Sequence, residues 1–142
     1  MAGFLSPVCA AGSLAGYVWY DNATRPDLGT PIGAVRQYLN AYLSDRDTGR
    51  AAQFACGGTA DIPNVKAARD DLVSREAQYN VSIRVSTDTI RVTSQANHDA
   101  DVSAHVVLTT VLQGNSERAV EQWTFRTHDD GGWRVCDGHE VG

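Results

Sequence analysis

The apolar positions after residue 30 recur at the spacing of an amphipathic helix. Thr30 and Pro31 are typical of a helix start, because threonine can cap free amides and proline loses no hydrogen bond in the first turn. The pattern predicts a helix that ends near Asp45. Its apolar positions are Ile32, Val35, Tyr38, Leu39, Tyr42 and Leu43.

Two further helices are predicted before residue 80. Asp47 and Thr48 can cap a short helix over 49–56, which the glycine pair 57–58 would stop. A third helix should follow Pro63 and run to about Gln78. Its inward positions would be Val65, Ala68, Leu72 and Val73.

After Asn80 the apolar period changes from 3.6 to 2, which is typical of strands. The alternation predicts separate strands over 81–86 and 89–93, followed by a long strand over 102–112. A strand over 120–127, a tight turn at 129–132 and a returning strand over 133–141 complete an antiparallel meander. Helices followed by such a meander predict an α+β fold.

Composition limits the size and the partners of this fold. The chain has 142 residues with 42% hydrophobic and 20% charged positions, which suits one small ordered domain. Its net charge of −5 lacks the basic excess of a nucleic-acid-binding protein. Of the twelve basic residues only Lys66 is lysine, a bias that G+C-rich coding produces and that predicts an actinobacterial source.

The segment 1–20 differs from the rest of the chain. It has no charged residue or histidine and closes on Tyr17, Trp19 and Tyr20, residue types that favour a membrane interface. At about 1.5 Å per residue, the nineteen residues from Ala2 to Tyr20 would reach about 28 Å as a helix, close to the thickness of a bilayer core. We expect a transmembrane anchor or its remnant; the alternative is a soluble N-terminal segment, since no basic residue precedes the run. A linker over 21–29 and a folded domain over 30–142 would follow.

Gly12 and Gly16 form the spacing that lets two membrane helices approach closely. This pattern would favour a homodimer. The alternative is chance, because the segment is rich in glycine and alanine.

Three segments together resemble the nuclear transport factor 2-like superfamily. They are the helix Val35–Leu43, the short helix ending at Phe54-Ala55-Cys56, and the hairpin from Trp123 to Cys136. The resemblance covers 30–141 and implies a cystatin-like cone, in which N-terminal helices pack on a curved antiparallel sheet. This superfamily also holds SnoaL-type cyclases and ketosteroid isomerases. The chain is similar, in particular, to small mycobacterial domains held outside the cytoplasm by one membrane helix, including the mammalian-cell-entry-associated membrane proteins.

The cysteines indicate in which cellular compartment the folded domain lies. Cys9 lies in the apolar run, which leaves Cys56 and Cys136 in the folded domain. The cone implied by the resemblance packs the helix layer on the last strand, so a disulfide between them is expected. The alternative is two buried free thiols. A disulfide would imply an oxidising compartment, and with the anchor it predicts a membrane-anchored, extracytoplasmic domain.

Candidate chemistry is sparse. Glu121 shares a strand face with Trp123 and Phe125, so a cone lined by that face would make it a proton donor, as the likeness to the isomerases implies. The alternative is a carboxylate near solvent or paired with Arg118 or Arg134. Candidate ligand-pocket residues are Tyr38, Tyr42, Trp123 and Trp133, with a role in the core as the alternative. No metal or cofactor is expected, since no Cys-x-x-Cys, ligand-like histidine spacing or nucleotide-binding motif occurs.

Two classes of function remain open. The first is a non-enzymatic accessory domain of the cell envelope that contacts a membrane-embedded or envelope protein complex. The second is a small-molecule binder or an isomerase- or cyclase-like enzyme, which would need Glu121 inside a deep pocket. The packing of the cone and the environment of Glu121 distinguish the two classes.

Overall fold

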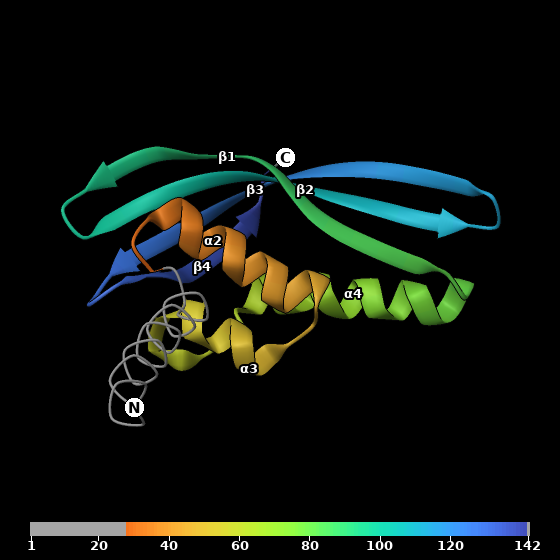
Figure 1. Ribbon diagram of the computed structural model, residues 1–142, viewed down its shortest axis with the longest axis horizontal. Coiled ribbons are helices and arrows are strands. Elements are labelled where there is room, and N and C mark those ends of the chain that lie inside the picture. Colours follow the sequence, from red (N-terminus) through yellow and green to blue (C-terminus); the bar gives the residue numbers. More distant parts are fainter. Residues whose placement is uncertain (1–27, 142) are drawn as a thin grey trace, which may run out of the picture.

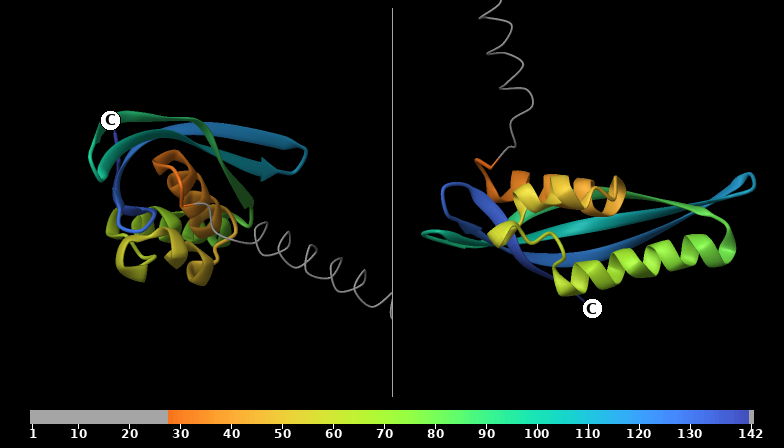
Figure 2. Two further views of the ribbon diagram at one scale, coloured as in Figure 1. Left: turned by 60° about the vertical axis from the view of Figure 1, so that its left-hand side comes forward. Right: turned by 90° about the horizontal axis from the view of Figure 1, so that it is seen from below.

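The computed structural model describes residues 28–141, which form helices packed on one curved antiparallel sheet. The sheet has the order β1-β2-β3-β4, with every neighbouring pair antiparallel. Its strands are β1 (Ser82–Ala96), β2 (Asp99–Leu112), β3 (Asn115–Asp129) and β4 (Trp133–Glu140). The first helix lies within the hollow of the sheet (Figure 2). This arrangement confirms the predicted α+β class with N-terminal helices on a curved sheet.

The first helix fills the hollow. It consists of α2 (Pro31–Leu39), which continues as a π-helix, η1 (Asn40–Ser44). The Thr30 hydroxyl accepts a hydrogen bond from the Gly33 amide at 3.0 Å, so the predicted cap is present. Asp45 closes the last turn through its amide, which donates to the Asn40 carbonyl. The predicted start and end of this helix are therefore confirmed.

The second predicted helix is broken into three short pieces. They are α3 (Thr48–Ala51), η2 (Ala52–Phe54) and η3 (Cys56–Gly58). The predicted cap is present, since the Asp47 carboxylate accepts from the Arg50 amide. A single helix over 49–56 was the wrong expectation, because Ala55 is extended and forms a parallel bridge with Val135 of β4. Pairing with the sheet replaces the helical hydrogen bonds at this point.

The third helix, α4 (Pro63–Tyr79), ends where Asn80 adopts a left-handed conformation. Val65 and Leu72 are buried as predicted, whereas Val73 is 45% exposed. Figure 2 shows α4 running beside the sheet toward the start of β1. The helix therefore carries the chain to the far end of the molecule before the sheet begins.

The two strands expected between 81 and 93 are one strand, β1. Its pairing with β2 shifts between Asp88 and Arg91, and Thr89 in this bulge has a φ of 49°. Val85 packs into the core before the bulge, and Val92 packs against it after the bulge. Before the bulge the odd-numbered residues of β1 face the helices, and after it the even-numbered residues do. The extra residue in the bulge therefore keeps the apolar side chains of both stretches on one face of the sheet.

Aromatic side chains fill the hollow between helix and sheet. Tyr38 and Tyr42 stack at 5.4 Å between ring centroids, and Trp123 and Phe125 stack at 5.8 Å. Tyr38, Tyr42 and Phe125 are fully buried. The Tyr38 hydroxyl donates to the Ala60 carbonyl at 2.7 Å, which satisfies its polar atom inside the core. The part of the cone that these rings occupy is therefore packed.

A disulfide joins Cys56 to Cys136, with 4.8 Å between their Cα atoms. It ties the short helices to β4 and closes a sequence separation of 80 residues. The expected disulfide is thereby confirmed, and the alternative of two free thiols is not.

The N-terminal predictions lie outside the described residues. These are the apolar segment 1–20, the glycine spacing within it, Cys9, and the linker as far as residue 27. Within residues 28–141, none of the helices combines the length and the apolar character needed to cross a bilayer. The described chain begins beside β4, where the Trp133 amide donates to the Leu28 carbonyl at 2.8 Å.

Candidate functional site

The end of the molecule formed by the β2–β3 hairpin has an exposed apolar surface. Residues 133–140 of β4 pair with residues 123–129 of β3, so the half of the β2–β3 hairpin that contains its turn extends past β4 (Figure 1). Exposed large apolar side chains gather on this hairpin and on the nearby end of α4. They are Tyr79, Val111, Leu112 and Val120, with Tyr79 63% exposed.

A groove of about 530 Å³ lies between the end of α4 and the hairpin turn. Left-handed backbone at Asn80 and Gly114 forms its two corners. Its lining is uncharged and consists of Tyr79, Asn80, Val81, Ser82, Val111, Leu112, Gln113 and Gly114. We call this feature the hairpin-end groove. An uncharged, half-apolar surface of this kind suits an apolar partner better than an ionic one.

A second groove, of about 460 Å³, lies over Tyr42 at the start of α4. The Tyr42 hydroxyl donates to Asp61 at 2.7 Å, and the Arg69 guanidinium lies 4.6 Å above the Tyr42 ring. Arg69 also donates to the Thr48 hydroxyl and to the Arg46 carbonyl. Arg69 thereby joins α4 to the turn that follows η1, and this cluster has a clear structural role.

Both buried tyrosines remain protonated at neutral pH. Burial, followed by the hydrogen bond to Asp61, raises the pKa of Tyr42 to about 12. Burial and the neighbouring Tyr42 raise the pKa of Tyr38 further. A phenol with a raised pKa donates hydrogen bonds and does not act as a base at neutral pH.

Glu76 joins α4 to the outer strand of the sheet. One of its oxygens forms an ion pair with Arg46, and the other accepts from the Ile83 amide at 2.9 Å. Burial alone would raise the pKa of Glu76, but the hydrogen bonds from Arg46 and Ile83 outweigh it, so the pKa lies below its ordinary value of 4.5. Folding therefore favours the ionised carboxylate.

This shift predicts an acid-sensitive contact. A lowered pKa contributes stability above the ordinary value of 4.5, and this stability is lost as the pH falls through the lower folded value. The free energy of unfolding, measured in denaturant at pH 7 and pH 3.5, should fall more for the native chain than for Glu76→Gln. Glu140→Gln changes an exposed carboxylate and serves as the control. Equal losses in the native chain and in Glu76→Gln would contradict the assignment.

Glu121 lies half-buried on the helix-facing side of β3. Its carboxylate accepts a 3.4 Å hydrogen bond from the Trp123 indole. It lines neither of the two grooves above, as far as residues 28–141 define them. A role of Glu121 as a proton donor remains a prediction.

The four candidate pocket residues lie in different places. Tyr38, Trp123 and Trp133 are buried in the core, and Tyr42 is the one whose side chain also lines a described groove. Their role as ligand contacts remains a prediction. The sequence analysis missed Asp61 and Arg69, which complete the Tyr42 cluster, and Tyr79 and Leu112 of the hairpin-end groove. A signal was available for Leu112, since it ends the alternating strand two residues before the turn glycine Gly114.

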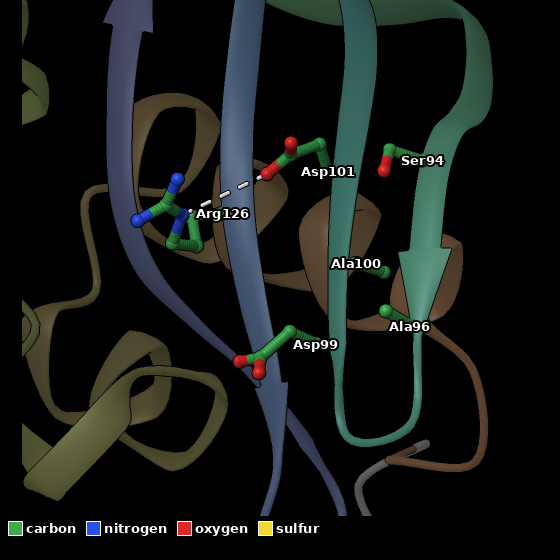
Figure 3. A pocket seen from close by; sticks show the side chains of 6 residues that line it. All are labelled: Ser94, Ala96, Asp99, Ala100, Asp101 and Arg126. Carbon is green, nitrogen blue, oxygen red and sulfur yellow. Dashed lines mark ion pairs between the residues drawn. The ribbon is translucent and has the colours of Figure 1, made fainter.

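A third groove, of about 320 Å³, lies on the outer face of the sheet, opposite α2 (Figure 3). Asp99, Asp101 and Arg126 line it, and the Arg126 Nε lies 3.7 Å from Asp101. This ion pair is exposed and contributes little to stability. Across residues 28–141, the structure has no group of three or more side chains arranged to hold a metal ion.

Comparison with known proteins gives matches among solved structures alone. No protein-family model matches the sequence, and no curated protein matches it. The intermembrane-space region of the chloroplast protein ARC6 is 16% identical, with a TM-score of 0.48, over 83% of this chain and 98% of that chain. A protein named as an aromatic ring hydroxylase from Novosphingobium aromaticivorans is 12% identical, with a TM-score of 0.48, over 78% and 87%.

A third solved structure is named as the beta subunit of an aromatic-ring-hydroxylating dioxygenase from Novosphingobium aromaticivorans. It is 14% identical, with a TM-score of 0.49, over 76% of this chain and 86% of that chain. Likenesses of this size say nothing about activity or partners.

Proposed function

We propose that this protein is a non-enzymatic accessory domain of the cell envelope, which is anchored by its N-terminal segment and binds a partner protein through the hairpin-end groove. The observation that supports this proposal is a contrast between the hollow of the sheet and the end of the β2–β3 hairpin. Aromatic rings fill the hollow of the sheet, whereas exposed apolar side chains gather where the hairpin extends beyond β4. A contact surface needs such a patch and does not need an open cone.

The position of the groove supports this role. The described chain begins at Leu28 beside β4, and the β2–β3 turn lies at the other end of the long axis (Figure 1). A domain tethered through residues 1–27 would therefore direct the groove away from its attachment point. Because the lining is uncharged, the partner chemistry that fits it is an apolar helix or strand of another envelope protein.

The disulfide supports the extracytoplasmic placement. Disulfides persist in oxidising compartments and are rare where thiols are kept reduced. The Cys56–Cys136 bond joins two separate elements and is part of the packed fold. The placement predicts that these two cysteines resist alkylation in unreduced protein taken from its native cells.

Site-specific photo-cross-linking in the native host tests the proposed contact. A photoreactive residue at Leu112 should give one discrete cross-linked protein, whereas the same residue at Gln95, an exposed position at the opposite end of the sheet, should give none. Leu112→Asp, in a chain carrying the photoreactive residue at Tyr79, should remove the product. Equal labelling from Leu112 and Gln95, or no product from either groove position, would overturn the proposal.

The alternative class, a small-molecule binder or an isomerase- or cyclase-like enzyme, has one observation in its favour. The Tyr42 hydroxyl lies beside a groove and is held as a donor by burial. However, the partners of Arg69 account for this cluster as a structural tie. The packed hollow favours the accessory role over a site built on Glu121.

A further inference from the structure

The outer edge of β1 is open along the middle of the strand. β1 is an end strand of the sheet, and within residues 28–141 its other edge pairs with no strand. A groove of about 590 Å³ is lined by five consecutive β1 residues, 82–86, together with Ser44, Arg46, Glu76 and Thr109. An unpaired edge of this kind can accept a strand from another chain.

The backbone direction at this edge follows from one hydrogen bond. The Ile83 amide points away from β2, since it donates to Glu76 of α4. Backbone groups alternate along a strand, so the amide and carbonyl groups of Val85 and Thr87 also point outward. These two residues precede the bulge at Thr89, where the regular edge ends.

The charges on this edge are self-complementary. Arg84 and Asp88 are both exposed, and they lie two residues on either side of Ser86. An antiparallel pairing of two β1 strands centred on Ser86 places Arg84 of each chain opposite Asp88 of the other. The same pairing places Val85 opposite Thr87, which are the residues whose backbone groups point outward.

The part of β3 that β4 leaves unpaired does not have this property. Residues 115–122 of β3 extend past β4, and their charged side chains are Glu117, Arg118 and Glu121. When two copies of one strand pair antiparallel about a two-fold axis perpendicular to the sheet, each odd-numbered residue lies opposite an odd-numbered residue. Each even-numbered residue lies opposite an even-numbered one. Arg118 therefore cannot lie opposite either glutamate, so this segment of β3 lacks the charge complementarity of β1.

We propose that two copies of this chain pair through β1, antiparallel about a two-fold axis at Ser86, and join their sheets into one. The contact runs from Arg84 to Asp88. It uses the outward backbone groups of Val85 and Thr87 and two symmetric Arg84–Asp88 ion pairs, while Ile83 keeps its bond to Glu76. This contact is separate from the hairpin-end groove and does not depend on the proposed partner.

A cysteine at the axis tests the geometry directly. In this pairing the two copies of Ser86 face each other as a non-hydrogen-bonded pair with Cα atoms about 4.5 Å apart, a distance that a disulfide spans. The full chain carrying Ser86→Cys and Cys9→Ser, oxidised in detergent, should give a covalent dimer on a non-reducing gel. Ser94→Cys in the same background is the matched control, since it is an exposed serine of β1 beyond the bulge. Cross-linking of Ser86→Cys no greater than that of Ser94→Cys would overturn the proposal.

A charge exchange tests the ion pairs. Arg84→Asp alone and Asp88→Arg alone place like charges opposite each other and should each raise the dimer Kd by about tenfold, measured by sedimentation of the full chain in detergent. The double variant exchanges the two charges and should restore the native Kd. A native chain that stays monomeric, or a dimer unchanged by Arg84→Asp, would overturn the proposal. The latter result would indicate association through the Gly12–Gly16 segment or another surface.

Discussion

Removal of the Cys56–Cys136 disulfide should lower the free energy of unfolding by about 4 kcal/mol. The expectation follows from the 80-residue separation that the bond closes, because a cross-link of that length restricts the unfolded chain strongly. The variant is Cys56→Ala with Cys136→Ala, measured by denaturant unfolding against the native chain under non-reducing conditions.

Cys9→Ala is the matched control, since Cys9 lies outside the disulfide and should leave the transition unchanged. Reduction of the native chain should reproduce the unfolding curve of the double variant. A native chain and a double variant that unfold within about 0.5 kcal/mol of each other would contradict the role given to this bond.

Leu39→Ala should lower the free energy of unfolding by about 2–5 kcal/mol. Leu39 is 1% exposed at the end of α2, in the part of the helix that fills the hollow of the sheet. Truncation removes apolar contacts and leaves a cavity, because the sheet and the π-helical turn that follows can collapse onto it only in part.

Val73→Ala provides a comparison with the same kind of truncation at an exposed position. Val73 is 45% exposed on α4, so its loss should cost less than about 0.5 kcal/mol. Denaturant unfolding of both variants measures the difference. Equal effects of the two substitutions would place Leu39 outside the core.

Local signals predicted the starts of the first two helices well. Thr30 and Asp47 cap the helices for which the sequence analysis proposed them, and the alternating apolar residues of β2 face the core. These features depend on residues within one turn of each other or on a regular period, so a single stretch of sequence contains the information.

The departures from prediction arise from contacts between distant residues. Ala55 leaves the helix because it pairs with Val135. In β1, the residues that face the core change from odd-numbered to even-numbered, and only the pairing with β2 shows that this change is a bulge. The sequence shows that change of phase at residues 85 and 90, but two separate strands would produce the same pattern.

The candidate site was harder to predict than the fold. Arg46 and Glu76 are 30 residues apart, and the Tyr42 cluster joins side chains from η1, α4 and the loop before α4. Leu112 can be recognised in the sequence as the end of a strand, but its exposure cannot. Its exposure depends on where α4 ends beside the hairpin, which is a property of the tertiary packing.

The hydrogen bond between Leu28 and Trp133 determines how tension would enter the domain. A pull on the chain before Leu28 is transmitted to the beginning of β4 as well as to α2. Cys136 lies three residues beyond Trp133 and is covalently held to Cys56, so peeling of β4 from this end would stop at that bond. Mechanical extension through the N-terminus should therefore release only the first residues of β4 before it meets a covalent block.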